Sequence, residues 1–233
     1  GVSNACHVLA DSKSTRRDLV EVMGVSPQKV TVVYPGVEAR FNRVHDTDTL
    51  ARVTVRYELP ERFILGLSTI QPRKNFDGLI QAFRRLIADP RGREEFSDLH
   101  LIICGGFGWM FEETVELVEQ LGLQGRVRFP GFVMDEDLPA LYTLASVFAF
   151  PSWYEGFGLP VLEALACGTP VVAANNSSLP EVVGNGGLMV DAADQDSLAD
   201  ALSTVLTDHG LRDTLVHAGR AHAAQFSWDK AAE

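Results

Sequence analysis

Residues 150–174, FPSWYEGFGLPVLEALACGTPVVAA, decide the fold class of this chain. The stretch predicts a buried strand, a glycine-rich loop, a short helix and a second strand, in that order. Pro160 is typical of a first helical position, and Gly168 is typical of the residue that closes a helix. This succession indicates the repeating unit of an α/β protein with a parallel sheet.

The same alternation extends in both directions. We expect short apolar strands within 62–68, 99–106, 127–131 and 188–190, and helices within 76–89, 110–122, 135–145 and 179–184, followed by two terminal helices. Residues 7–24 predict a strand leading into a helix, residues 29–34 predict a strand, and residues 46–60 are mixed and polar, with no assigned element. Nearly continuous apolar strands are typical of a parallel sheet buried on both faces. The expected fold is α/β, a Rossmann-like domain with a mainly parallel sheet flanked by helices.

Composition narrows the class of partner. The chain has 233 residues, 46% of them hydrophobic, which suits one large domain with a substantial core. Its 20 basic and 31 acidic residues give a net charge of −11, which argues against an extended nucleic-acid surface. Three cysteines without C-x-x-C spacing favour a cytoplasmic location, and no apolar run is long enough to cross a bilayer. Peripheral association with the inner face of a membrane is compatible with these observations.

Two glutamates in the opening stretch are the strongest candidates for chemistry. Glu155 lies in the predicted loop and Glu163 in the first turn of the predicted helix, so both carboxylates are expected to face one cavity beyond the strand ends. One could bind a sugar and the other a ribose. The alternative is structural: Glu163 would complement the helix dipole, and Glu155 would be a solvated loop residue.

The glycines beside Glu155 predict an anion-binding loop. Gly156 and Gly158 permit tight backbone turns, so the amides of Phe157, Gly158 and Leu159 can point into the cleft at the helix start. This arrangement suits a phosphate or a sugar hydroxyl.

Two further pairs follow predicted strands. Arg73 and Lys74 come between an apolar strand and a helix, where two cations could neutralise a diphosphate; the alternative is an ordinary solvated basic pair. Ser177 and Ser178 are interpreted as the cap of a short helix that packs beside the glycine loop.

A rival motif lies at residues 104–108, CGGFG, which resembles the start of a dinucleotide fingerprint. It lacks the third glycine, because Phe111 occupies that place. Close approach of the backbone to a nucleotide explains Gly105 and Gly106 as well, and a plain strand-to-helix turn is the remaining alternative. Residues 135–137, Asp-Glu-Asp, are interpreted as an N-cap and an acidic first helical turn, and no metal is assigned to them.

Taken together, these motifs resemble a known family. The segment EGFGLPVLEALACGTPVVA (155–173) is similar to the E-x7-E signature of retaining GT-B glycosyltransferases of family 4, also called group 1 glycosyltransferases. Further matching pieces occur in the right order: QPRKN (71–75), ICGG (103–106), VRFPGFV (127–133) and SSLPEVVG (177–184). The resemblance implies the C-terminal half of a GT-B fold. Residues 38–233 would form the nucleotide-sugar domain, and residues 1–37 the last elements of an N-terminal acceptor domain plus a linker.

The resemblance also implies a role for each candidate residue. Arg73 and Lys74 would bind the donor diphosphate and, with the sugar-facing Glu155, act as the catalytic residues. Glu163 would hold the donor ribose through its hydroxyls. The full set of donor-binding candidates is Gly105, Gly106, Phe132, Val133, Gly156, Phe157, Gly158, Leu159 and Glu163, with the nucleobase expected at Phe132 and Val133. No cofactor and no metal are expected beyond the nucleotide-sugar donor.

The expected activity is transfer of a sugar from a nucleotide-diphosphate donor to an acceptor hydroxyl with retention, in polysaccharide biosynthesis. The runs at 108–113, 133–142 and 177–184 look most like bacterial mannosyltransferases that use GDP-mannose. The acceptor would be a sugar or a lipid-linked glycan. Without the missing acceptor domain, this chain is expected to be inactive alone. The alternatives are a non-catalytic nucleotide-sugar-binding module, half of a split enzyme, or, less favoured, a GT-B epimerase or phosphorylase.

Overall fold

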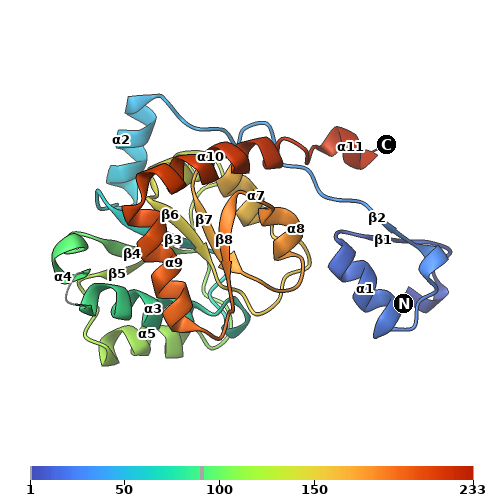
Figure 1. The fold of residues 1–233 in the computed structure, drawn as a ribbon, viewed down its shortest axis with the longest axis horizontal. Coiled ribbons are helices and arrows are strands. Elements are labelled where there is room, and N and C mark those ends of the chain that lie inside the picture. The colour runs from blue at the N-terminus through green and yellow to red at the C-terminus, as the bar shows by residue number, and fades with distance from the viewer. Residues whose placement is uncertain (1, 90–91, 233) are drawn as a thin grey trace.

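A six-stranded parallel sheet forms the centre of the molecule (Figure 1). The computed structural model describes residues 2–89 and 92–232. The strands are β3 Phe63–Leu67, β4 His100–Cys104, β5 Val127–Gly131, β6 Val147–Phe150, β7 Val171–Ala174 and β8 Gly187–Val190. They are arranged in the order β5-β4-β3-β6-β7-β8, and every neighbouring pair is parallel. This is the doubly wound order of a Rossmann-like sheet, so the predicted fold class is confirmed.

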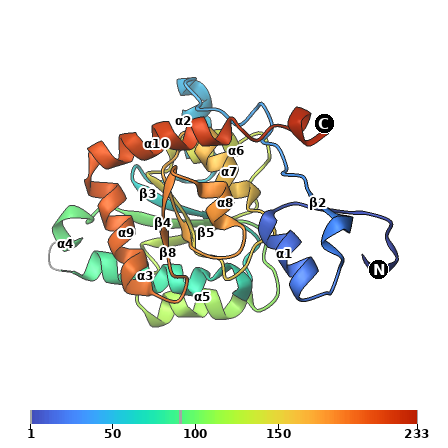
Figure 2. The same cartoon turned by 45° about the vertical axis from the view of Figure 1, so that its right-hand side comes forward.

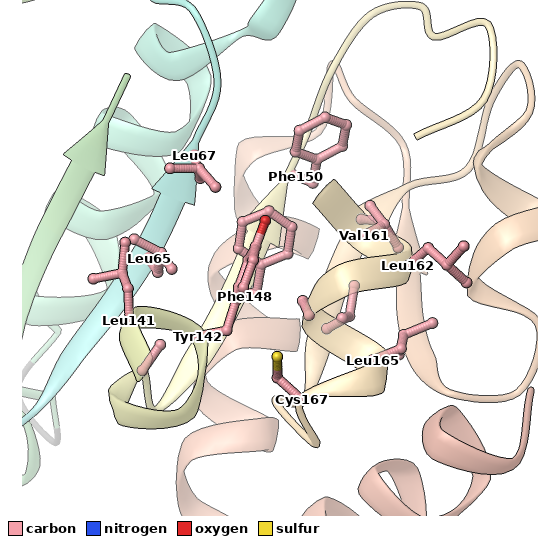
Figure 3. Packing of buried hydrophobic residues seen from close by; sticks show 14 of the residues in the cluster. Leu65, Leu67, Leu141, Tyr142, Phe148, Phe150, Val161, Leu162, Leu165 and Cys167 are labelled. Carbon is pink, nitrogen blue, oxygen red and sulfur yellow. The ribbon is translucent and has the colours of Figure 1, made fainter. Parts of the chain in front are cut away.

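Helices cover both faces of the sheet. The helices of this body are α2 Thr47–Arg56, α3 Phe76–Ala88, α4 Gly92–Glu95, α5 Phe111–Gln120, α6 Leu138–Leu144, α7 Leu159–Ala166, α8 Leu179–Val183, α9 Gln195–Thr207 and α10 His209–Ala223. The last helix, α11 Trp228–Ala232, lies beyond α10, away from the six-stranded sheet (Figure 1). Successive strand residues alternate between two cores: Phe148 packs with α6 and α7 (Figure 3), whereas Val147 packs with α3 and α9. None of the described helices combines the length and apolar character that a bilayer crossing requires.

A second, smaller unit lies beside this body (Figure 1). Strand β1 (Val8–Ala10), helix α1 (Lys13–Glu21) and strand β2 (Val30–Val32) form a two-stranded parallel sheet with one helix. The turned view in Figure 2 shows α1 next to α8. The strand and helix predicted within 7–24 and the strand predicted within 29–34 are therefore confirmed.

Helix α2 was not predicted, because most of residues 46–60 are polar and the apolar ones are few. Leu50, Val53 and Tyr57 nevertheless lie at helical spacing and pack into one core, with Val53 fully buried. The helix begins where the carboxylate of Asp46 accepts the backbone N–H of Thr49 at 3.1 Å, which caps its first turn.

Asp137 is the N-cap residue of α6, as interpreted from the sequence, but its carboxylate caps no backbone amide. The expected acidic first turn is wrong, because residues 135–137 all precede the helix. Asp137 is fully buried and accepts hydrogen bonds from Arg52 at 2.8 Å, Arg56 at 2.7 Å and the Tyr57 hydroxyl at 2.9 Å. Burial alone would raise its pKa, but these bonds outweigh burial, and the pKa lies below its ordinary value. Asp137 thus joins α6 to α2.

Candidate functional site

The candidate site lies where the strand order reverses. Strands β3 and β6 are neighbours in the sheet, with Leu65 opposite Phe148, yet their crossovers continue in opposite directions along the sheet. The loops that follow the two strands therefore diverge and leave a crevice at this edge, which is the usual ligand position in open α/β sheets. Arg73 and Lys74 lie in the loop after β3, and Glu155 lies in the loop after β6.

These three residues form one ion cluster. The Lys74 Nζ lies 2.6 Å from Glu155 Oε1, and the Arg73 Nη1 lies 3.0 Å from Glu155 Oε2. Lys74 and Glu155 are each only 8% exposed, and burial lowers the pKa of Lys74, although the bond to Glu155 acts in the opposite direction. The alternative that Arg73 and Lys74 are an ordinary solvated basic pair is therefore wrong, because both pair with Glu155 and Lys74 is buried. The sequence predicted their proximity but not that both cations would contact the glutamate.

Asn75 holds the two loops together, and sequence reasoning missed it. Its side-chain amide donates to the carbonyl oxygens of Pro151 at 3.0 Å and Ala192 at 2.8 Å. The backbone of Asn75 is left-handed, with φ of 55°, a conformation that asparagine tolerates better than most residues. The sequence feature that could have indicated this role is the position of an asparagine between a basic pair and the start of a helix. The backbone N–H of Trp153 also donates to the Arg73 carbonyl at 2.9 Å.

Ser177 and Ser178 contact the glycine loop directly. The hydroxyl of Ser178, fully buried, lies 3.0 Å from the carbonyl oxygen of Glu155 and 2.6 Å from that of Phe157. The Ser177 hydroxyl accepts the N–H of Glu155 at 3.0 Å. Ser178 is the N-cap residue of α8, as interpreted from the sequence, although its side chain caps no backbone amide of that helix. The contacts of the two serines lie about twenty residues away in sequence, which is why spacing did not reveal them.

The glycine loop is tightly constrained. Gly158 has a φ of 115°, and a Cβ there would lie 3.0 Å from Leu179 Cδ2, so the position requires glycine. The Phe157 ring is buried against Tyr34 and Phe226, which leaves its backbone as the part available to a ligand. Leu159, the first residue of α7, is partly exposed.

Glu163 occupies a separate position from Glu155. Because α7 begins at Leu159, Glu163 lies in the second helical turn rather than in the first, and the prediction of a first-turn residue is wrong. Its Oε2 accepts a hydrogen bond from the Tyr142 hydroxyl at 2.9 Å. Burial raises the pKa of Glu163, and the bond from Tyr142 partly offsets this rise.

The remaining donor-binding candidates differ in accessibility. A Cβ at Gly105 would lie 1.9 Å from the Ser68 carbonyl oxygen, so this glycine is explained by packing of the chain alone. Gly106 is exposed and faces open space. The Phe132 ring is 68% exposed, whereas Val133 is buried in the core. Of this pair, only Phe132 presents a side chain on which a base could stack.

The small N-terminal unit contacts the site through α8. The carboxylate of Glu181 accepts the backbone N–H groups of Lys13 and Ser14, each at 2.9 Å, and the Tyr34 hydroxyl at 2.7 Å. Lys13 and Ser14 open helix α1, where backbone N–H groups lack helical partners, so the carboxylate caps this helix from another element. The Thr15 hydroxyl also donates to the Gly156 carbonyl at 3.2 Å.

Known proteins resemble this chain in sequence over most of its length. The family profile "Glycosyl transferases group 1" matches residues 52–222. The chain is 43% identical over 178 residues to O-antigen chain mannosyltransferase B of Escherichia coli, covering 76% of this chain and 45% of that protein. It is 39% identical over 241 residues to D-inositol 3-phosphate glycosyltransferase of Salinispora arenicola, covering 98% of this chain and 53% of that protein.

Solved structures resemble the fold over nearly its whole length. Anabaena HepE in complex with UDP and glucose superposes with a TM-score of 0.83 at 25% identity, over 96% of this chain and 59% of that one. A Rickettsia africae glycosyltransferase gives a TM-score of 0.85 at 22% identity, over 97% of this chain and 60% of that one. The chain thus spans about half the length of the curated relatives it matches.

Proposed function

The chain belongs to the group 1 glycosyltransferase family, and from this premise we propose that it is the donor-binding part of a retaining glycosyltransferase. The enzyme would move a sugar from a nucleotide-diphosphate donor to an acceptor hydroxyl. The single observation that carries the proposal is the cluster of Arg73, Lys74 and Glu155 in the crevice between β3 and β6. The fold of the chain is that of the C-terminal half of GT-B structures.

Charge on the leaving diphosphate would be neutralised by this cluster. A retaining transfer passes through an oxocarbenium-like state in which the departing diphosphate gains negative charge. The side chain of Arg73 is 42% exposed, and its guanidinium carries more N–H donors than its contacts to Glu155 and the Tyr154 carbonyl use. Each charge-assisted hydrogen bond would contribute about 1.5–3 kcal/mol. Lys74 would add a second charge from the buried side of the crevice.

Glu155 would face the transferred sugar. Its carboxylate is fixed by Lys74 and Arg73, and its backbone is fixed by Ser177 and Ser178, so a sugar hydroxyl would meet an acceptor already in place. The amides at Phe157, Gly158 and Leu159 would serve the phosphates at the start of α7.

The nucleoside would extend toward the other side of β3. Glu163 would bind the ribose, and the exposed ring of Phe132 would pack on the base. Because Gly106 has no side chain, the nucleotide could lie close to its backbone. Gly105 would contribute through its backbone alone, and Val133 likewise.

GDP-mannose is the donor we favour, for polysaccharide biosynthesis. The E. coli mannosyltransferase at 43% identity supports this choice, whereas HepE holds UDP and glucose and the Salinispora relative is a D-inositol 3-phosphate glycosyltransferase. Residues 38–233 would be the donor domain and residues 1–37 the end of an acceptor domain that binds a sugar or lipid-linked glycan. We place the enzyme in the cytoplasm, at the inner face of the membrane when the acceptor is lipid-linked.

The second candidate is a nucleotide-sugar-binding module without activity of its own. The ion cluster and the glycine loop would suffice for such binding, and this chain covers 45% and 53% of the two curated relatives described above. Residues that complete an acceptor site would then come from another segment or from a partner in a split enzyme.

A thermal-shift series with GDP-mannose, GDP-glucose, UDP-glucose and ADP-glucose tests the donor. At a ligand concentration about 100 times Kd, binding adds about 2.7 kcal/mol to the stability of the folded state, which raises Tm by about 5–10 °C for a domain of this size. We expect the largest shift with GDP-mannose. A larger shift with a UDP-sugar would overturn the mannose donor alone, and no shift with any nucleotide sugar would overturn the donor site itself.

A further inference from the structure

One buried hydroxyl near the proposed donor site, that of Tyr142, bonds to Glu163 and to no other residue that the structure describes. Tyr142 of α6 is fully buried, and its ring packs edge-on against Phe148, with 5.4 Å between centroids (Figure 3). The ring also packs edge-on against Phe41, with 6.2 Å between centroids. The Thr169 hydroxyl donates to the Tyr142 carbonyl at 2.6 Å. Both the ring and the backbone of Tyr142 are therefore fixed.

A phenylalanine would fill the same space without a polar atom. A buried tyrosine hydroxyl needs a partner, and Tyr142 finds it in Glu163 Oε2 at 2.9 Å. Burial raises the pKa of Tyr142 well above its ordinary value, so the phenol stays a donor throughout the physiological range. The hydroxyl can therefore serve as a permanent anchor for one oxygen of the carboxylate.

The second oxygen of Glu163 is differently placed. Among the described residues, Glu163 Oε1 accepts no hydrogen bond and is not among the buried, unpartnered atoms, so it remains open to a ligand. A carboxylate with one oxygen anchored and the other open presents a single acceptor in a fixed direction. The hydroxyl of a sugar ring matches such an acceptor.

We propose that Tyr142 is a positioning residue that orients Glu163 toward a ribose hydroxyl, and that this pair sets the preference for a ribonucleotide over a deoxyribonucleotide. The inference rests on the proposed function and adds to it a specificity-determining residue outside the E-x7-E segment. Tyr142 itself touches no substrate in this account. It acts through the carboxylate.

Calorimetric titration of GDP, 2′-deoxy-GDP and 3′-deoxy-GDP into the chain tests the pair. The unmodified chain is expected to bind GDP more tightly than at least one deoxy analogue. Tyr142→Phe should weaken GDP about tenfold, the equivalent of one hydrogen bond to a charged group, and leave the affinity for that analogue nearly unchanged. Glu163→Gln should also lose the discrimination, and Tyr142→Phe should have little further effect when added to Glu163→Gln.

A matched control separates positioning from stability. Tyr57→Phe also removes a hydroxyl that donates to a carboxylate, that of Asp137, and should lower the unfolding midpoint without changing the ratio of GDP to deoxy-GDP affinity. A purely structural role for Tyr142 would give the same result as Tyr57→Phe. Equal weakening of GDP and the deoxy analogues by Tyr142→Phe would therefore overturn the inference.

The pH dependence of GDP binding provides a second readout. The bond from Tyr142 lowers the pKa of Glu163, as does nearby Arg40, whereas burial and the charges of Glu38 and Asp135 raise it. Losing the hydroxyl should raise the pKa of Glu163 further. As pH is lowered, the Glu163 carboxylate of Tyr142→Phe should therefore become protonated, and GDP affinity should fall, at a higher pH than in the unmodified chain. An unchanged pH profile would contradict the inference.

The outcomes distinguish this inference from its premise. No binding of any nucleotide would overturn the proposed function and this inference with it. Binding that is sensitive to Glu163→Gln but not to Tyr142→Phe would overturn the role of Tyr142 alone.

Discussion

At the scale of single residues, the ion cluster is the feature that most changes the interpretation of the sequence. Position relative to predicted strands was sufficient to bring Arg73, Lys74 and Glu155 to one edge of the sheet. The contacts that orient them come from Asn75 and Ser178. These depend on the packing of loops far apart in the chain, which a local pattern does not encode.

Replacing the cluster's acidic member should affect turnover more than binding. In the complete enzyme, Glu155→Gln keeps the shape of the side chain but removes the charge that holds Lys74 and faces the sugar. We expect kcat to fall about 100-fold or more, with a smaller change in donor KM, because the interaction would be strongest in the transition state. Steady-state kinetics checks this, and an unchanged kcat would remove Glu155 from the catalytic set.

At the scale of elements, apolar runs predicted the four inner strands of the sheet, because buried parallel strands have few polar positions. The edge strands β5 and β8 were also predicted, although they are only partly buried. Helix α2 was missed because its sequence is mostly polar, and polar contacts add to the packing of Leu50 and Val53 in holding it. Arg52 and Arg56 are four residues apart, so they lie on one face of α2 and both reach Asp137. The acidic run at 135–137 was visible in the sequence, but its partners about 80 residues earlier were not.

The link between α2 and α6 should have a defined pH dependence. Asp137→Asn should lower the free energy of unfolding by about 1–3 kcal/mol at neutral pH, a modest value because both arginines are nearly half-exposed. The folded-state pKa of Asp137 lies below the ordinary 3.8, so its stabilising contribution is present above that value and is lost as pH falls through the folded-state pKa.

Urea unfolding at several pH values measures this effect. The difference between the two proteins should shrink only in strong acid. Asp191→Asn, which removes a charge that accepts one amide in an exposed turn, serves as the control and should change stability little. A difference that stayed constant with pH would contradict the role assigned to the Asp137 carboxylate.

At the scale of the whole molecule, the described residues form a six-stranded and a two-stranded sheet, and Glu181 links the units that contain them. The sequence indicated a separate strand and helix at the start of the chain. It could not indicate how they attach, because Glu181 is more than 160 residues from the amides that it caps. The same short stretch contains Ser178, so the element that orients Glu155 also anchors the N-terminal unit.

Loss of this anchor should loosen α1. In Glu181→Ala, the amides of Lys13 and Ser14 lose their acceptor, and their hydrogen exchange should accelerate about tenfold, as expected for a charge-assisted bond. Glu116→Ala, on the exposed face of α5, is the control and should leave exchange in α1 unchanged. Equal exchange in the Glu181 variant and the unmodified chain would show that other contacts hold the unit.

The most direct test of the account is a calorimetric titration of GDP into the chain and its Arg73→Ala variant, with Arg85→Ala as the control. Arg85 is a similarly exposed arginine of α3 that pairs with Asp196, away from the crevice. The account predicts binding at one site, weakened about tenfold or more by Arg73→Ala and unaffected by Arg85→Ala. No binding to the unmodified chain, or equal affinity in all three proteins, would contradict a donor site in the crevice between β3 and β6.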